Sequence, residues 1–208
     1  MSSVAEMPPT RAEWVDSLLR RAIVHGEVQP GEKLVAERLA EQWGVSATPL
    51  RETFQRLAAE GLVVIEPQRG ARVAPVSATH AAEIYEMRLL LDPVAIHQSV
   101  AHGQHDPAFA TEVDDAFRNL STGVDAHREF HLVLVSRCPN RRMVAQITQL
   151  LEQSQRYQML GLVSGKAHRA AADHRALREA AMQGRADNAA STLRAHLQGT
   201  LDAVRCMA

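Results

Sequence analysis

The spacing of apolar residues changes along this chain of 208 residues, and that change constrains its fold more than any other feature. Over residues 11–60 apolar side chains recur at intervals of three and four, which predicts helices. Over residues 62–73 they form two short β-rich runs around a turn, which predicts a hairpin. From residue 80 the helical spacing returns and continues almost to the C-terminus. We therefore expect a small unit of helices and one hairpin, followed by a larger, all-helical unit.

The first unit has the order of elements of a winged helix-turn-helix. Helices are expected over 11–25, 35–43 and 47–60, and a glycine directly follows each of them. The hairpin after the third helix would be the wing. In such a fold the second helix of the motif enters the major groove of DNA, with its N-terminal residues nearest the bases. The alternative is a small helical domain whose arginines are ordinary surface residues.

The second unit shows helical spacing in every long segment, and turn residues separate the segments. The expected helices cover residues 80–102, 106–119, 124–136, 140–161, 167–183 and 186–204. The predicted fold class is therefore mainly α, an N-terminal winged helix-turn-helix followed by an all-α bundle. The expected domain boundaries are a disordered N-terminus at 1–9, a winged domain at 10–76, a linker at 77–79 and a bundle at 80–204.

Composition excludes several classes of protein. The first 76 residues carry nine Lys/Arg against ten Asp/Glu, so any DNA contact must come from a local basic face. No apolar run reaches the roughly eighteen residues of a membrane span, and the N-terminus lacks the apolar region of a signal peptide. The two cysteines form no metal or redox motif. We expect a cytoplasmic protein with reduced thiols and no membrane partner.

Four histidines have the spacing of a metal site. His127 and His131 are one helical turn apart on an apolar face, and His174 and His196 lie on the apolar stripes of the last two helices. The latter two are each eleven residues from a turn centred near Arg185, hence about 16 Å from it and at one level of a helical hairpin. Neutral imidazoles from three helices could surround one Zn, Ni, Co, Fe or Cu ion. The alternative for each is a core histidine bonded to a carbonyl.

The helix expected over 80–102 is predicted to place a charged residue, Arg88, on its inward face. Its apolar neighbours on that face are Ile84, Met87, Leu91 and Ala95. An arginine that faces a core needs an anion. That anion is either Asp92, four residues further along the helix, or the carboxylate of a bound effector held by two of the guanidinium nitrogens.

An enzyme is the less favoured interpretation. The run from His127 to His131 invites comparison with the metalloprotease motif, but its acid, Glu129, is third and not second in the run. Glu129 therefore lies about 200° around the helix from His127. The sequence contains no nucleophile triad, no glycine loop for phosphate and no paired acids of a cleft. No catalytic residues are predicted.

The first unit resembles a known family through motifs that span about sixty-five residues. These are HGEVQPGEKL at 25–34, AERLA at 36–40, GVSATPLRE at 44–52, RLAAEGL at 56–62 and RGARV at 69–73. They are similar to the winged-helix domain of GntR-family bacterial transcription regulators. The resemblance implies DNA contacts at Glu37, Arg38, Ser46, Thr48, Arg51 and Gly70. Arg69 at the tip of the wing could enter a minor groove.

One position departs from the family pattern. The family usually has arginine between the serine and the threonine, whereas this chain has Ala47. A bidentate guanine contact worth about 1–3 kcal/mol would be missing. We therefore expect an atypical operator at that base pair.

The second unit resembles the FCD ligand-binding domain of the FadR branch of the same regulators. The motifs that carry this resemblance are YEMRLLLD at 85–92, EFH at 129–131, PN at 139–140 and the paired His174 and His196. It implies a bundle of six or seven helices that holds a divalent metal through an acid and three histidines, with a small carboxylate effector beside it. His131, His174 and His196 match the three histidines, and His127 stands at the place of the acid. An all-imidazole site would be more positive by one charge and would favour a softer metal or an anionic effector, unless water replaces His127.

Together these features predict an effector-responsive transcription regulator, a repressor that binds a double-stranded DNA operator as a homodimer. The expected cofactor is a divalent transition metal, zinc before nickel, cobalt or iron. Arg88 is the candidate effector-binding residue. The main alternative is a regulator whose signal is the metal itself. A metalloenzyme would need an open coordination position and a general base.

Overall fold

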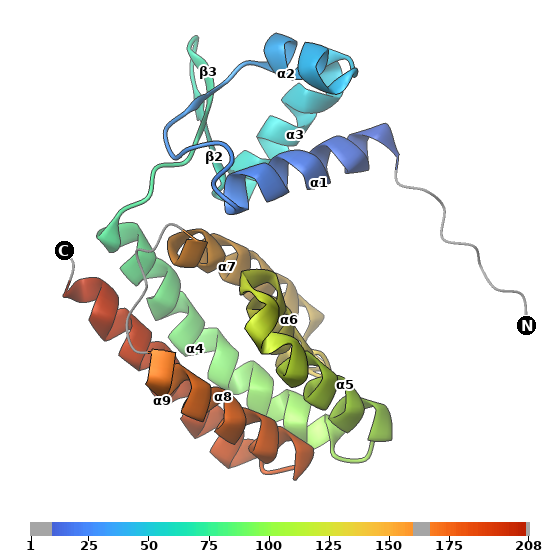
Figure 1. Ribbon diagram of the computed structural model, residues 1–208, viewed down its shortest axis with the longest axis vertical. Helices are drawn as coiled ribbons and strands as arrows, with labels where there is room; N and C mark the ends of the chain where they lie inside the picture. Colours follow the sequence, from blue (N-terminus) through green and yellow to red (C-terminus); the bar gives the residue numbers. More distant parts are fainter. Residues whose placement is uncertain (1–9, 160–166, 207–208) are drawn as a thin grey trace, which may run out of the picture. The chain divides into compact units, whose positions relative to one another are not determined.

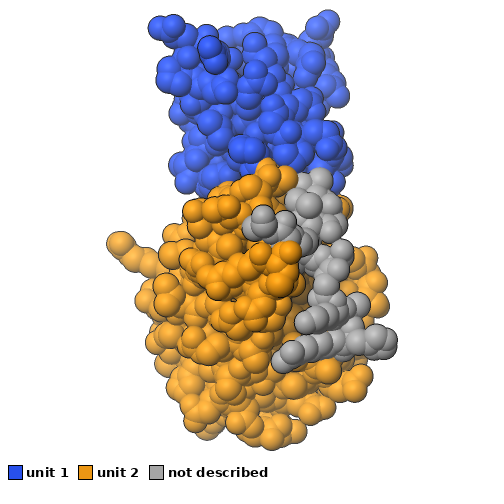
Figure 2. Space-filling view, turned by 90° about the vertical axis from the view of Figure 1, so that its left-hand side faces the viewer, with its two compact units in different colours: residues 1–75 blue, residues 76–208 orange. Residues whose placement is uncertain are grey.

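The structure is a computed structural model that describes residues 10–159 and 167–206. The chain falls into two compact units, Met1–Pro75 and Val76–Ala208 (Figure 2). Each unit has a hydrophobic core of its own. The disorder expected at residues 1–9 lies outside the described residues, as does the end of the helix expected over 140–161.

The helices of the first unit are α1 (Arg11–Val24), α2 (Ala36–Trp43) and α3 (Ala47–Ala59). α1 begins with a capping box, in which Thr10 accepts from the Glu13 N–H while the Glu13 carboxylate accepts from the Thr10 N–H. Gly44 caps the C-terminus of α2, and its φ of 64° lies in the left-handed region that favours glycine. That residue makes the sharp turn into α3, and the predicted helix-turn-helix follows.

A small antiparallel sheet completes the first unit. The strands β2 (Val63–Glu66) and β3 (Gly70–Val73) form the predicted hairpin, with Ile65 opposite Ala71. A further strand, β1 (Lys33–Leu34), pairs with the other edge of β3, so that the sheet order is β1-β3-β2. The sequence did not predict β1, because two residues are too few to show an alternating pattern.

The second unit is the predicted helical bundle (Figure 1). Its elements are α4 (Ala78–Gly103), α5 (Pro107–Arg118), the 3₁₀ helix η1 (Asn119–Thr122), α6 (Val124–Val135), α7 (Arg141–Met159), α8 (Ala167–Met182) and α9 (Ala186–Arg205). α4 runs along α9, and α8 and α9 form a helical hairpin (Figure 1). Among the helices that the structure describes, none is both long and apolar enough to cross a membrane.

The linker expected at 77–79 is not a separate segment. The Ser77 side chain caps α4 by accepting from the His80 N–H at 3.0 Å, and the helix begins at Ala78. The boundary between the two units lies at Pro75, just before this cap.

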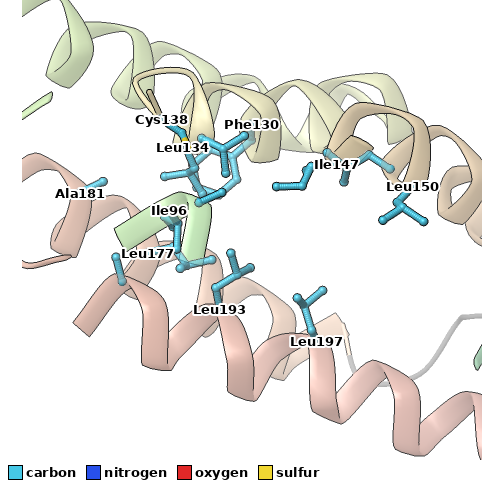
Figure 3. Close-up of a cluster of buried hydrophobic side chains, with 14 of the residues drawn as sticks. Ile96, Phe130, Leu134, Cys138, Ile147, Leu150, Leu177, Ala181, Leu193 and Leu197 are labelled. Carbon is cyan, nitrogen blue, oxygen red and sulfur yellow. The ribbon is translucent and has the colours of Figure 1, made fainter. Parts of the chain in front are cut away.

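The core of the bundle fixes the helices that carry the four histidines. Ile96 of α4, Phe130 and Leu134 of α6, Leu177 of α8 and Leu193 of α9 are at most 1% exposed and point into one shared core (Figure 3). Phe130 is the neighbour of one histidine, and Leu177 and Leu193 are each three residues from another. Close packing at this core therefore sets the positions of the histidines that lie beside it.

The inward face of α4 differs from the prediction. Met87 is 45% exposed, and Leu91 is only half-buried. The predicted residues that are buried are Ile84, Arg88 and Ala95. Tyr85 and Ile96 also point inward, because α4 packs against α6, α7 and α9 and buries a wider face than a helix at the surface of a protein.

Candidate metal centre and DNA-binding surface

The structure brings the four predicted histidines together. His127 and His131 come from α6, His174 from α8 and His196 from α9. One ring nitrogen from each lies within 4.8 Å of those of the other three. The ring centroids of neighbouring members are 4.7 Å apart for His127 and His131, and 4.9 Å apart for His174 and His196. We call these four residues the histidine cage. Their action as metal ligands stays a prediction.

The local sequence explains why the rings meet. Four residues span about one helical turn, so His127 and His131 lie on the same side of α6. The α8–α9 hairpin turns at Gly184, whose φ of 66° is in the left-handed region. His174 and His196 are at similar distances from that turn along two antiparallel helices, which places their rings at one level.

Burial leaves nitrogen atoms of the cage without partners. His131 is 3% exposed and His174 is 7% exposed. Within the part of the chain that the structure describes, the Nε2 atoms of both rings have no hydrogen-bond partner. An unsatisfied buried polar atom is costly and requires an explanation, for which a bound cation is one physical solution.

The cage is uncharged at neutral pH. Burial lowers the pKa of His127 to about 3, and repulsion from His174 and His196 contributes. Burial lowers the pKa of His174 to about 4 and brings that of His131 well below its ordinary value. The pKa of His196 is also lowered by burial, although its hydrogen bond to Asp173 opposes that shift. Neutral imidazole is the form that binds a metal ion.

Arg88 lies inside the bundle with two partners. Its side chain is 2% exposed, its Nε donates to Asp92 Oδ2 at 2.9 Å, and its Nη1 donates to Ser154 Oγ at 3.2 Å. Nη2 lies 2.9 Å from the same Asp92 oxygen, yet it makes no hydrogen bond among the described residues, and neither does Asp92 Oδ1. The charge of Arg88 also helps to lower the pKa values of His127 and His131. The charge of Arg88 thus acts on these two histidines while Arg88 is bonded to Asp92.

The predicted DNA contacts of the first unit are all exposed. They are Glu37, Arg38, Ser46, Thr48, Arg51, Arg69 and Gly70. A groove of about 520 Å³ lies between the start of α2, α3 and the wing, and Glu37, Arg51, Arg69 and Gly70 are among the residues that line it. Arg38, Ser46 and Thr48 lie outside that lining. The structure therefore places four of the seven residues along one groove.

An ion pair connects the two helices of the DNA-binding motif. Arg51 of α3 donates to Glu37 of α2, and both side chains are largely exposed. The Glu37 pKa is lowered, first by a backbone hydrogen bond of Glu37 and then by the charge of Arg51. Ser46 is the N-cap residue of α3 but makes no side-chain capping bond, and Ala47 packs half-buried against the core.

Sequence reasoning missed three partners of the buried polar groups. Asp173 bonds to His196 across the α8–α9 hairpin, and Ser154 bonds to Arg88 from 66 residues away. The buried Tyr157 has its hydroxyl oxygen 2.7 Å from Nδ1 of the half-buried His80. No sequence signal marks these pairs, because each depends on how separate helices pack.

A winged helix-turn-helix joined to a helical bundle with a buried polar site is typical of a class of transcription regulators. Comparisons with known protein families support this class. Residues 11–73 match the family described as bacterial regulatory proteins, gntR family, and residues 83–199 match the FCD domain. The chain belongs to the GntR family of DNA-binding transcription regulators, and its second unit is an FCD effector domain. The predicted family and fold class are confirmed, and the family consists of regulators, not enzymes.

Individual relatives share 20–29% of their residues with this chain but match it over most of its length. The HTH-type transcriptional regulator BphR of Paraburkholderia xenovorans is 29% identical over 203 residues, which cover 90% of this chain and 82% of BphR. The HTH-type transcriptional repressor GlaR of Escherichia coli is 26% identical over 155 residues, 69% of this chain and 70% of GlaR. The structure of McbR/YncC from E. coli covers 96% of this chain and 99% of its own with a TM-score of 0.80, at 20% identity. That last likeness shows the fold alone.

Proposed function

We propose that this protein represses transcription as a homodimer and releases or binds its operator in response to a small organic acid beside a divalent metal. The single observation that carries the sensor proposal is the histidine cage, four neutral imidazoles with ring nitrogens within 4.8 Å of one another. The repressor assignment is supported by the similarity to GlaR, which is named a repressor. The homodimer is supported by the two half-sites that operators of helix-turn-helix proteins contain.

The donor atoms of the cage fit a transition metal. All four candidate ligands are ring nitrogens, which suit zinc first and nickel, cobalt or iron next, and which do not suit magnesium or calcium. The unsatisfied Nε2 atoms of His131 and His174 are the atoms that would hold the ion. When bound, the metal supplies a positive charge to which an effector carboxylate can bind.

Arg88 would give a bound effector a second cationic partner besides the metal. The Nη2 of Arg88 has no hydrogen-bond acceptor among the described residues, so a carboxylate oxygen could accept from it. An effector would then share Arg88 with Asp92, which already holds Nε at 2.9 Å. The proposed effector is thus an anion that contacts Arg88 and the metal.

On the DNA side, α3 would enter the major groove with Thr48 and Arg51 toward the bases. Arg69 at the wing would reach a minor groove, and Gly70 would let the backbone approach the phosphates. The pair of Arg51 with Glu37 holds the guanidinium in the groove of the protein before DNA arrives.

The operator affinities of metal-stripped and metal-reloaded protein distinguish this proposal from the alternative in which the metal itself is the signal. An operator is first obtained by binding-site selection, and its affinity is then measured with and without candidate organic acids. The proposal expects an acid to change operator affinity only in the reloaded protein, and expects Arg88→Lys to weaken the acid response without abolishing DNA binding. A reloaded protein that responds to no organic acid at all would count against it.

The alternative is a regulator whose signal is the metal. Four protein ligands would fill a tetrahedral site and leave no open position for an effector, and this feature of the cage favours the alternative. In that case reloading alone changes operator affinity, and organic acids have no further effect. If His127 does not ligate, its place is open to the effector. His127→Ala then keeps both the metal and the acid response.

A further inference from the structure

We infer that Asp173 is a positioning residue of the metal centre, which orients His196 toward the ion and balances part of its charge from behind the ring. The inference rests on the proposed metal-binding function. It concerns a residue that neither the sequence motifs nor the family comparison identified.

The hydrogen bond between Asp173 and His196 selects one form of the imidazole. Nδ1 of His196 lies 3.2 Å from Oδ2 of Asp173. An ionised carboxylate can only accept, so the proton of the neutral ring must be on Nδ1. The lone pair is then on Nε2, on the other side of the ring, where a metal ion can use it. The bond thus sets both the tautomer and the direction of His196.

The position of Asp173 in the hairpin makes this contact specific. Asp173 belongs to α8, directly before the cage residue His174, while His196 belongs to α9. The carboxylate therefore joins the two arms of the α8–α9 hairpin at the level of the cage. The side chains of His196 and Asp173 are 11% and 23% exposed, so solvent screens the contact only in part.

The charge of Asp173 also matters at this site. The four imidazoles are neutral, and the positive charge of Arg88 is matched by Asp92 at 2.9 Å. A divalent ion would add two positive charges to a buried region. Asp173 bonds to one member of the cage, His196, and directly precedes another, His174, in α8. It supplies a negative charge that the imidazole ligands themselves lack.

Zinc affinity of the full-length protein tests this role. Zn²⁺ affinity is measured by chelator competition for wild type, Asp173→Ala, Asp173→Asn and Asp173→Glu. We expect Asp173→Ala to weaken zinc binding by about 10–100-fold. Asp173→Asn keeps an oxygen that can accept from Nδ1 but loses the charge, so its affinity should lie between those of wild type and Asp173→Ala. Asp173→Glu keeps the charge and should recover more of the affinity than Asp173→Asn.

A second readout separates positioning from general stability. The ligand-field spectrum of the Co²⁺-loaded protein should change in Asp173→Ala, because the direction of one imidazole changes. Asp202→Asn is the matched control, since Asp202 is an exposed α9 carboxylate that bonds to Gln198, and it should leave affinity and spectrum unchanged.

The outcomes distinguish a failure of the role of Asp173 from a failure of the metal-binding proposal on which that role rests. If wild type binds neither Zn²⁺ nor Co²⁺, the metal proposal itself fails. If wild type binds zinc and Asp173→Ala and Asp173→Asn bind it equally well with unchanged cobalt spectra, only the role of Asp173 is refuted. If Asp173→Ala does not fold, Asp173→Asn decides, because it preserves the shape of the side chain.

Discussion

The two units hold the charged pairs proposed for DNA and effector binding in opposite ways. In the winged unit the Arg51–Glu37 pair lies in solvent, with side chains 65% and 64% exposed. In the bundle the Arg88–Asp92 pair is 2% and 3% exposed. An exposed pair contributes little to stability and can be exchanged for a phosphate or a base. A buried pair is coupled to folding, since removal of one partner leaves a charge without solvent or counter-ion. DNA binding should therefore be separable from stability, whereas effector sensing should not.

Loss of one partner from each pair tests this contrast most strongly. Asp92→Ala should destabilise the bundle by about 3–5 kcal/mol, because Arg88 keeps its charge in a buried place. Glu37→Ala should leave the free energy of unfolding unchanged within error. Urea unfolding followed by circular dichroism measures both. The double variant Arg88→Met with Asp92→Leu is the control, and it should recover much of the loss. Equal destabilisation by Asp92→Ala and Glu37→Ala would refute the contrast between the units.

Metal removal should affect the two units differently. A ligand that binds only the folded state stabilises it by about 2.7 kcal/mol at a hundred-fold excess over its Kd. Because the cage lies in the second unit, the unfolding transition of the bundle should shift on chelation while that of the winged unit stays in place. Differential scanning calorimetry with and without zinc measures this shift. His131→Ala should abolish it, and His97→Ala, at an exposed α4 position, should preserve it. A zinc-dependent shift in His131→Ala would contradict the proposed ligand.

The helices and strands also differ in how well the sequence predicts them. Within the described residues 10–159 and 167–206, the helix ends agree with the helical spacing to within about two residues, because amphipathic periodicity reports burial directly. The histidine cage was predictable for the same reason, since each ring lies on an apolar stripe. Met87 was placed inside wrongly, because apolar residues lie on both sides of α4 and only its neighbouring helices decide which are buried. Strand β1 is too short to show a pattern.

The polar partners of the site were beyond prediction. Asp173 and Ser154 take their roles from helices far apart in sequence that meet in the folded bundle. The residues proposed for DNA contact could be named from the sequence because the family motif is local, on α2, α3 and the wing, and their contact with DNA stays a prediction. A short surface motif can be identified from the sequence because its residues are close together in the chain. The partners in a buried polar network cannot, because they come together only when the helices pack.

Operator preference is the next test, because it involves only the first unit. Ala47→Arg would add a guanidinium at the start of α3, where a bidentate contact to guanine is worth about 1–3 kcal/mol. Binding-site selection with wild type and variant should yield operators that differ at one base pair in each half-site. Zinc affinity of the variant should equal that of wild type. An unchanged operator preference would show that position 47 does not face a base.

The smallest expected effect concerns the helix caps, where the units resemble each other. Asp106 caps α5 by accepting from the Ala108 N–H at 3.0 Å and also accepts from Arg137 at 2.9 Å. The bond from Arg137 and then that from Ala108 lower its pKa below the ordinary 3.8. Its contribution to stability is therefore complete above about pH 4 and is lost as the pH falls through the lowered pKa. In α1 the cap hydroxyl of Thr10 does not titrate, and Glu13 provides the carboxylate.

Urea unfolding at pH 7 and pH 3 measures this cap. Asp106→Ala should be slightly less stable than wild type at pH 7, and the difference should narrow at pH 3, below the ordinary 3.8, where the unfolded state binds the proton more readily than the folded state does. Asp106→Ser keeps a capping oxygen that does not titrate, so its deficit at pH 7 should be smaller than that of Asp106→Ala. A deficit of Asp106→Ala that stays the same at both pH values would mean that the uncharged carboxyl caps α5 as well as the carboxylate does, and that Arg137 adds nothing to it.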